Sequence, residues 1–139
     1  MTNIWINPVF GEITSLFGYR YNPVLHDVYE FHNGIDIAVV EGTNVYAVKD
    51  GMITEIRYSP TLGNLLRFTT YSGYEVMYAH LNEVLVELGA QVYQGQVVAT
   101  SGNTGLSSGP HLHYSIWYNN ELVDPLHYVE LPFSSWINS

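Results

Sequence analysis

The sequence of 139 residues contains no cysteine and only four basic side chains. Without cysteine, the chain cannot form a disulfide, a thiolate metal site or a thiol nucleophile. A metal site in this chain would therefore have to use histidine, aspartate or glutamate. With 13 acidic residues the formal net charge is −9, and no lysine or arginine follows Arg67. This charge balance does not suit nucleic-acid phosphates or anionic membrane surfaces, and we expect neither as a partner.

The sequence also lacks a long apolar run. No segment approaches the roughly 18 apolar residues of a membrane-spanning helix, so we expect no membrane insertion. The first ten residues, MTNIWINPVF, have neither a basic start nor a long apolar stretch, and no signal peptide is predicted in this chain. Hydrophobic residues make up 47% and charged residues 12% of the chain. This length and composition predict one globular domain, residues 1–139, with a buried core.

Short segments rich in β-branched and aromatic residues recur along the chain, separated by turn signals, which is typical of an all-β domain. Tight hairpins are predicted at 70–75 and 118–125. The segment 81–89, LNEVLVELG, is ambiguous and could form at most one short helix. The predicted strands, mostly antiparallel, are 51–58, 64–70, 73–81, 95–100 and 111–118.

Two segments of the sequence resemble each other weakly. EGTNVYAVKDGMIT (41–54) and LGAQVYQGQVVAT (88–100) each contain Gly-x-x-Val-Tyr followed by a glycine and further apolar residues. Two such half-motifs could build a symmetric sandwich. Coincidence among turns rich in glycine and valine is the alternative, and the sequence alone leaves both open.

Two of the six histidines lie two residues apart in SSGPHLHYSIWY (107–118). Residues i and i+2 of a strand point to the same face, so His111 and His113 are predicted to project side by side. In FHNGIDIAV (31–39), His32 and Asp36 are four residues apart around a glycine, which permits a turn between them. Each pattern taken alone is also typical of an ordinary loop or strand surface.

A further histidine ends the strand predicted in YEVMYAHLNE (74–83). Regular alternation along this strand places His80 on the same face as Val76 and Tyr78. A lone histidine at the end of a strand is usually structural, so His80 gains a functional interpretation only from the other histidines.

Taken together, these residues predict a metal site. His32, Asp36 and one histidine of the 111/113 pair would supply three protein ligands and leave one position for water, which is the makeup of a catalytic zinc site. The sequence lacks a His-Glu-x-x-His motif, which would supply a glutamate base. His80 and the other histidine of the pair are therefore the candidates for acid and base catalysis, because imidazole titrates near neutral pH.

An ordered set of motifs resembles the lysostaphin-type zinc endopeptidases, also called LytM-domain peptidoglycan hydrolases. The resemblance runs from about Pro8 to Val129, which sets the expected core of the domain at about 8–129. It is carried by ITSLFGYRYNP, FHNGIDIAV, GTNVYAVKDGMI, YAHL, GQVVATSGNTGLSSGPHLHYSI and VDPLHYV.

The resemblance implies a function and a set of site residues. It implies one zinc ion per chain, held by His32, Asp36 and His113, and catalytic roles for His80 and His111. The implied substrate is the peptide part of bacterial peptidoglycan, in its cross-links or stem peptides, and relatives differ in the bond that they cleave. The implied location is the cell envelope or the extracellular cell wall, with a phage-encoded protein as another possibility. The implied fold is a compact antiparallel β-sandwich related to the biotinyl and lipoyl carrier domains.

The loop before His32 is a further candidate region. In the same family, this loop places a tyrosine on the substrate in some relatives and an extra, blocking metal ligand in latent forms. Tyr29 is therefore a candidate substrate contact, while Asn22 and His26 have no role that position alone can assign. The segment 102–110, GNTGLSSGP, is predicted to be a flexible loop that walls the cleft.

Two other functions remain open at this point. A cupin-like Fe(II) oxygenase also carries His-x-His on a β-sandwich, but it needs a carboxylate a few residues later, and the sequence reaches one only at Glu121. A catalytically silent or latent LytM-type domain could instead serve as a binding or scaffold module in a cell-envelope complex. The retained ligands and both candidate catalytic histidines favour the enzyme.

Overall fold

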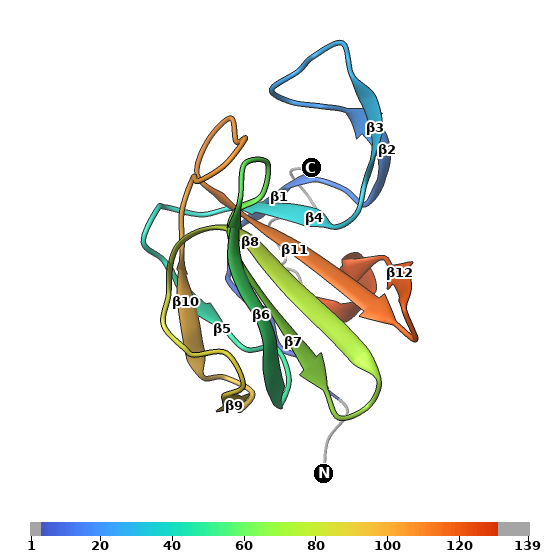
Figure 1. Ribbon diagram of the computed structural model, residues 1–139. Helices are drawn as coiled ribbons and strands as arrows, with labels where there is room; N and C mark the ends of the chain where they lie inside the picture. The colour runs from blue at the N-terminus through green and yellow to red at the C-terminus, as the bar shows by residue number, and fades with distance from the viewer. Residues whose placement is uncertain (1–3, 131–139) are drawn as a thin grey trace.

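The computed structural model describes residues 4–130, and these residues form twelve β-strands and one short 3-10 helix (Figure 1). The predicted all-β fold with antiparallel pairing is therefore confirmed, while its relation to the carrier domains stays a prediction. No helix among residues 4–130 has the length and apolar character needed to cross a membrane. The elements are β1 (Glu12–Ser15), β2 (Gly18–Tyr21), β3 (Tyr29–His32), β4 (Ile35–Ala38), β5 (Asn44–Tyr46), β6 (Gly51–Ser59), β7 (Gly63–Thr70), β8 (Tyr74–Val84), β9 (Gln91–Val92), β10 (Val97–Ser101), β11 (His111–Tyr118), β12 (Glu121–Val123) and η1 (Pro125–Tyr128).

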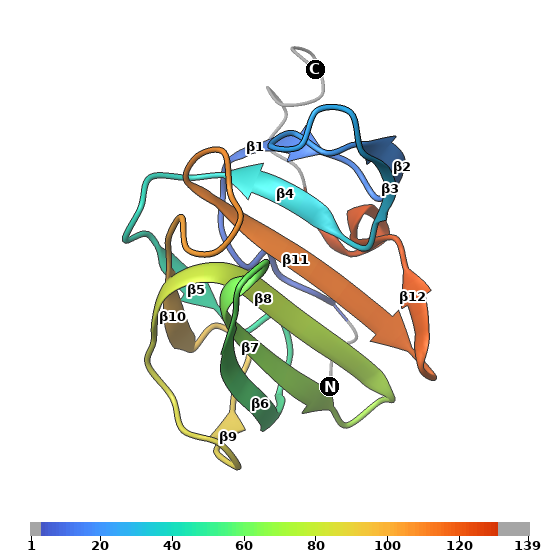
Figure 2. The same ribbon diagram turned by 45° about the horizontal axis from the view of Figure 1, so that its top comes forward.

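Ten of the strands form one antiparallel sheet. Its main path runs β1-β4-β11-β8-β7-β6-β9, while β10 pairs with β5 and β8, and β12 pairs with β11. Figure 2 shows β11 and β8 side by side in the middle of this sheet. Both strands are buried along most of their length. The ends of β4, β11 and β8 therefore offer a rigid base for a functional site.

All five predicted strands are present, with bounds that differ by at most three residues. The segment 81–89 is not a helix, because β8 continues to Val84 and pairs with β10. Both predicted hairpins form, joining β7 to β8 and β11 to β12. In the second hairpin, Asn119 and Asn120 both have positive φ, as a type I′ turn requires.

The two similar half-motifs occupy related places in the sheet. Strand β5 of the first motif pairs with β10, which follows in the second, and β9 of the second motif pairs with β6, which follows in the first. The corresponding valines, Val45 and Val92, are both fully buried. This exchange of partners supports the two-motif interpretation over coincidence.

Strands β2 and β3 form a separate hairpin that stands away from the main sheet (Figure 1). The register pairs Arg20 with Glu30 and Gly18 with His32, so these four residues share one face of the hairpin. The other face carries a row of exposed aromatic rings: Tyr19, Tyr21, Tyr29 and Phe31.

Candidate metal centre

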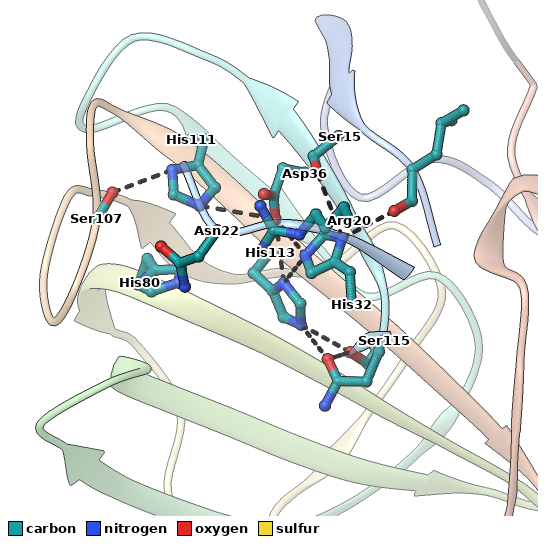
Figure 3. Close-up of polar contacts among 12 residues, drawn as sticks. Ser15, Arg20, Asn22, His32, Asp36, His80, Ser107, His111, His113 and Ser115 are labelled. Atoms are coloured by element: carbon teal, nitrogen blue, oxygen red, sulfur yellow. Dashed lines mark hydrogen bonds and ion pairs between the residues drawn. The ribbon is translucent and has the colours of Figure 1, made fainter. Parts of the chain in front are cut away.

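Three buried side chains, His32, Asp36 and His113, converge where β3, β4 and β11 meet (Figure 3). His113 is the register partner of Asp36 on the neighbouring strand, so both side chains project from the same face. His32 reaches the same point through the turn at Gly34. A Cβ atom on Gly34 would lie 2.2 Å from the carbonyl oxygen of Tyr114, so only glycine allows this close approach.

One atom from each of these three side chains faces the other two, and the three atoms form a small triangle. His32 Nε2 lies 3.3 Å from Asp36 Oδ1, His113 Nδ1 lies 3.1 Å from the same oxygen, and the two nitrogens are 3.2 Å apart. Ligands about 2.0–2.1 Å from a tetrahedral zinc ion lie about 3.3–3.4 Å from one another. The observed triangle therefore fits three ligands of a tetrahedral metal site.

Hydrogen bonds on the outer side of both rings fix which nitrogen faces the triangle. His32 Nδ1 lies 3.0 Å from the carbonyl oxygen of Leu16, and His113 Nε2 lies 2.8 Å from both Asn33 Oδ1 and Ser115 Oγ. Because the carbonyl and amide oxygens only accept, these outer nitrogens carry the hydrogen. With both hydrogens on the outer nitrogens, two imidazole lone pairs and one carboxylate oxygen face each other, and a proton or a metal ion is needed between them. Outer partners of this kind are typical of metal-binding histidines.

The ionisation of the cluster also suits a cation. Burial raises the pKa of Asp36, but hydrogen bonds and charge interactions with His113 and His32 outweigh this effect and hold its pKa well below the usual range. Burial lowers the pKa of His113, which outweighs the opposite effect of Asp36. At neutral pH, the carboxylate is therefore ionised and His113 is neutral, as metal ligands must be.

His80 reaches the site through a β-bulge. The β7–β8 register shifts between Asn64 and Leu66, so that Ala79 and His80 together face Leu65. His80 has φ +59°, and its backbone N–H donates to the Leu62 carbonyl at 2.7 Å. Regular alternation would have left His80 on the core face with Tyr78, so that part of the sequence interpretation was wrong. The bulge turns the ring into the cleft instead.

His80 and His111 lie beside the triangle, with ring centroids 4.7 Å apart. His80 Nδ1 lies 2.7 Å from the carbonyl oxygen of Thr104, and His111 Nδ1 lies 2.7 Å from that of Gly109. Both rings therefore carry hydrogen on Nδ1 and leave the Nε2 lone pair free. His111 Nε2 lies 3.7 Å from Asp36 Oδ1. Burial lowers the pKa of His80 to about 4, outweighing the opposite effect of Thr104, so this ring is a neutral base at pH 7.

An open cleft of about 810 Å³ surrounds these residues. The β2–β3 hairpin and its loop line one side, and segments 61–62 and 106–110 line the other. The loop 102–110 walls the cleft as predicted, and it is tied to the body at several points. Thr104 Oγ1 donates to the Leu81 carbonyl at 2.7 Å, and the Leu106 N–H donates to the Thr61 carbonyl at 2.9 Å.

The candidates in the hairpin loop lie apart from the triangle. Tyr29 is not among the described residues that line the cleft, and its exposed ring packs against Tyr19 and Tyr21 on the outer face of the hairpin. Tyr21 does line the cleft, and the contact of Tyr29 with substrate stays a prediction. Asn22 does line the cleft, but its amide oxygen accepts from two N–H groups of its own loop. His26 Nε2 is hydrogen-bonded to the Pro23 carbonyl.

Sequence reasoning missed the outer partners Leu16, Asn33 and Ser115. A weak signal was available for two of them, because Asn33 follows a ligand directly and Ser115 lies two residues after His113 on the same face. The Leu16 carbonyl has no side-chain signature in the sequence.

A small antiparallel β-fold with a buried His-Asp-His triangle, two adjacent histidines and an open cleft defines a metallopeptidase type of site. Residues 30–125 match the family model described as peptidase family M23. The chain belongs to this family. This membership confirms the resemblance that the motifs indicated. It argues against the alternative of a cupin-like Fe(II) oxygenase.

Relatives and solved structures agree with this membership. The chain is 41% identical over 124 residues to the DD-carboxypeptidase/endopeptidase Mpg of Neisseria meningitidis, covering 89% of this chain and 28% of that protein. It therefore spans little more than a quarter of that relative. A zinc-containing peptidase from Vibrio cholerae has a TM-score of 0.78 and 35% identity, covering 93% of this chain and 40% of that one.

Two further structures are similar. The catalytic domain of lysostaphin from Staphylococcus simulans has a TM-score of 0.71 and 29% identity, covering 83% of this chain and 88% of that one. A chain of the SpoIIQ–SpoIIIAH pore-forming complex has a TM-score of 0.79 and 26% identity, covering 98% and 97% of the two chains. The same fold thus occurs in peptidases and in a chain of a pore-forming complex.

Proposed function

We propose that this chain is a zinc-dependent endopeptidase that hydrolyses peptide bonds in the cross-links or stem peptides of bacterial peptidoglycan. The observation that carries the proposal is the triangle of three buried metal-ligand atoms beside two histidines with free Nε2 lone pairs. Membership of family M23 and the name of the Neisseria relative support the reaction and the substrate. The proposed location of this activity is therefore the cell envelope or cell wall.

In this proposal His32, Asp36 and His113 would hold one zinc ion, and all three residues line the cleft through which substrate would reach it. Two imidazoles and one carboxylate also suit Fe(II), but the family and the zinc-containing Vibrio structure favour zinc. When bound, zinc polarises a peptide carbonyl and makes a coordinated water more acidic. The fixed outer hydrogen bonds keep both ligand rings in their binding orientation before the metal arrives.

The chain's own acid and base are His80 and His111. Each ring holds hydrogen on Nδ1 through a backbone carbonyl, so each can accept a proton at Nε2 from the attacking water. The protonated ring can then donate that proton to the departing amine. A ring that stays protonated can also stabilise the negative oxygen that develops on the carbonyl.

Two measurements test the proposal. The purified chain should contain one zinc per molecule by elemental analysis. Zinc-loaded chain incubated with purified peptidoglycan should release peptide fragments that mass spectrometry assigns to cleaved amide bonds. The matched control carries His80→Asn and His111→Ala together and should bind zinc without releasing fragments. Zinc at full occupancy with intact peptidoglycan would contradict the enzymatic function.

A second candidate function is a non-catalytic module in a cell-envelope complex. The similarity to a chain of the SpoIIQ–SpoIIIAH complex over nearly the whole sequence favours this alternative. The same digestion experiment separates the two, because a scaffold module would bind peptidoglycan or a partner without cutting amide bonds.

A further inference from the structure

Arg20 is the only lysine or arginine among the described residues that line the cleft. It lies on the face of the β2–β3 hairpin that also carries His32, because its register partner is Glu30 and His32 follows two residues later. Such diagonal neighbours have their backbones about 7–8 Å apart, within reach of a long side chain. A positive charge is therefore held close to the proposed metal ligands in a chain of net charge −9.

The guanidinium of Arg20 is incompletely paired. Its Nε is buried and has no hydrogen-bond partner among residues 4–130. Its ion pair with Glu30 is long, at 3.8 Å, and the same Glu30 oxygen accepts from Asn22 Nδ2 at 2.9 Å. The side chain is only 21% exposed, so water compensates little of this deficit. A buried donor without a partner costs free energy, and an arginine fork is well suited to a carboxylate.

We propose that Arg20 binds a carboxylate of the substrate, next to the bond that is cleaved. This inference rests on the proposed function and narrows its substrate class. In a D-alanyl cross-link to the D-centre of a diamino acid, the carbon that bears the scissile nitrogen also bears a free carboxylate. A D-alanyl-D-alanine terminus has the same feature, whereas the interior of a glycine bridge lacks it. Arg20 thus selects D-alanyl bonds followed by a carboxylate over glycyl-glycine bonds.

The test compares binding of two peptides that differ only in this group. One peptide ends in D-alanyl-D-alanine as the free acid, and the other ends in the corresponding carboxamide. Calorimetry on the zinc-loaded chain carrying His80→Asn and His111→Ala together measures binding, because this double variant is expected not to cleave the peptide. We expect the acid to bind about 10- to 100-fold more tightly than the amide, the worth of a charge-assisted hydrogen bond. Arg20→Gln should abolish this preference, and Arg20→Lys should keep part of it.

The matched control is Arg57→Gln. Arg57 is 52% exposed on β6, is paired with Glu55 at 2.6 Å and does not line the cleft. This variant should keep the full preference for the acid. Equal binding of acid and amide by the Arg20-containing chain would overturn the inference. So would an equal loss for both peptides in Arg20→Gln, because it would assign Arg20 to the structure of the hairpin.

Peptidoglycan digestion by the unmodified chain keeps the two proposals separable. If the acid is preferred through Arg20 but no amide bond is cut, hydrolysis fails and the carboxylate site stands. If bonds are cut but acid and amide forms are bound and cleaved alike, hydrolysis stands and the role of Arg20 fails. The acid-to-amide ratio in kcat/KM of the wild type provides this second comparison, and we expect the difference mainly in KM.

Discussion

His80 and His111 come from different strands, yet both are oriented by carbonyl groups of one loop. Thr104 accepts from His80 and Gly109 accepts from His111, and both carbonyls belong to segment 102–110. The ring centroids are 4.7 Å apart as a result. The ligand histidines of the triangle are oriented by groups outside this loop: Leu16 between β1 and β2, Asn33 between β3 and β4, and Ser115 on β11. Metal binding and acid–base chemistry can therefore be perturbed separately.

The first prediction separates the two histidines of the 111/113 pair. His113→Ala should lose most of its zinc, because only two protein ligands remain. His111→Ala should retain the metal, since the His111 ring lies outside the triangle. Elemental analysis after dialysis at equal free zinc checks both variants. Loss of zinc from His111→Ala with retention in His113→Ala would reverse the assignment.

The second prediction concerns loop 102–110. Gly105 has φ +78°, and a Cβ there would lie 2.3 Å from the Gly63 nitrogen, so Gly105→Ala should displace the loop. We expect lower activity with unchanged zinc content, because the loop orients His80 and His111 and no triangle residue. Gly109→Ala is the control, since its added Cβ would meet open space. Similar activities of the two variants in a peptidoglycan release assay would argue against this role.

The third prediction uses two buried tyrosines that are register partners on β8 and β11. The Tyr78 hydroxyl donates to the Tyr46 carbonyl at 2.8 Å and accepts from the Val48 N–H at 3.2 Å. The Tyr114 hydroxyl is buried without a partner among the described residues. Tyr78→Phe should lower the free energy of unfolding by about 1–3 kcal/mol, because the buried Val48 N–H and the partly buried Tyr46 carbonyl lose their partner.

Tyr114→Phe should leave stability unchanged or raise it by up to about 1–2 kcal/mol, because the removed hydroxyl is desolvated without compensation. Urea unfolding at pH 7 measures both variants under identical conditions. Equal destabilisation by the two substitutions would mean that the hydrogen bonds of the hydroxyl groups do not determine the change in the free energy of unfolding.

The fourth prediction concerns acid stability of the metal-free chain. Burial lowers the pKa of His80 from 6.5 to about 4, and burial lowers that of His113 as well. Between about pH 6.5 and 4 the unfolded chain binds protons that the folded chain excludes. Stability present above pH 6.5 should therefore fall toward pH 4, with His80 alone contributing up to about 3 kcal/mol. The depressed pKa of Asp36 adds losses only below its unfolded value of 3.8.

Urea unfolding in chelator at pH 7, 5.5 and 4.5 measures this loss. His80→Asn should make the free energy of unfolding less dependent on pH. Asparagine is chosen because it tolerates the positive φ at this position. A His80→Asn profile as steep as that of the wild type would remove His80 as a source of the pH dependence.

The sequence predicted the five longest of the twelve strands and the metal-ligand candidates, because both depend on local spacing. Period-two alternation gave β11 and the shared face of His111 and His113, and the glycine between His32 and Asp36 indicated the turn. The choice of His113 over His111 came from the family resemblance. Spacing could not reveal the bulge at His80, which depends on the register of β8 against β7. Nor could it show that Arg20 and His32 share a hairpin face.

The last prediction concerns division of the acid–base work between His80 and His111. Peptide hydrolysis needs a proton taken from water and a proton given to the amine, and both rings offer a free Nε2 for these transfers. His80→Asn and His111→Ala should each lower the rate by about 10²–10⁴, the usual worth of a positioned acid or base, while zinc content stays unchanged. If the rings act as a unit, the double variant will lose much less than the product of the single losses.

Turnover of a D-alanyl peptide by the wild type and the three variants, each with confirmed zinc stoichiometry, measures these effects. Undiminished activity of His80→Asn would remove His80 from the mechanism and leave it as a structural residue of the bulge.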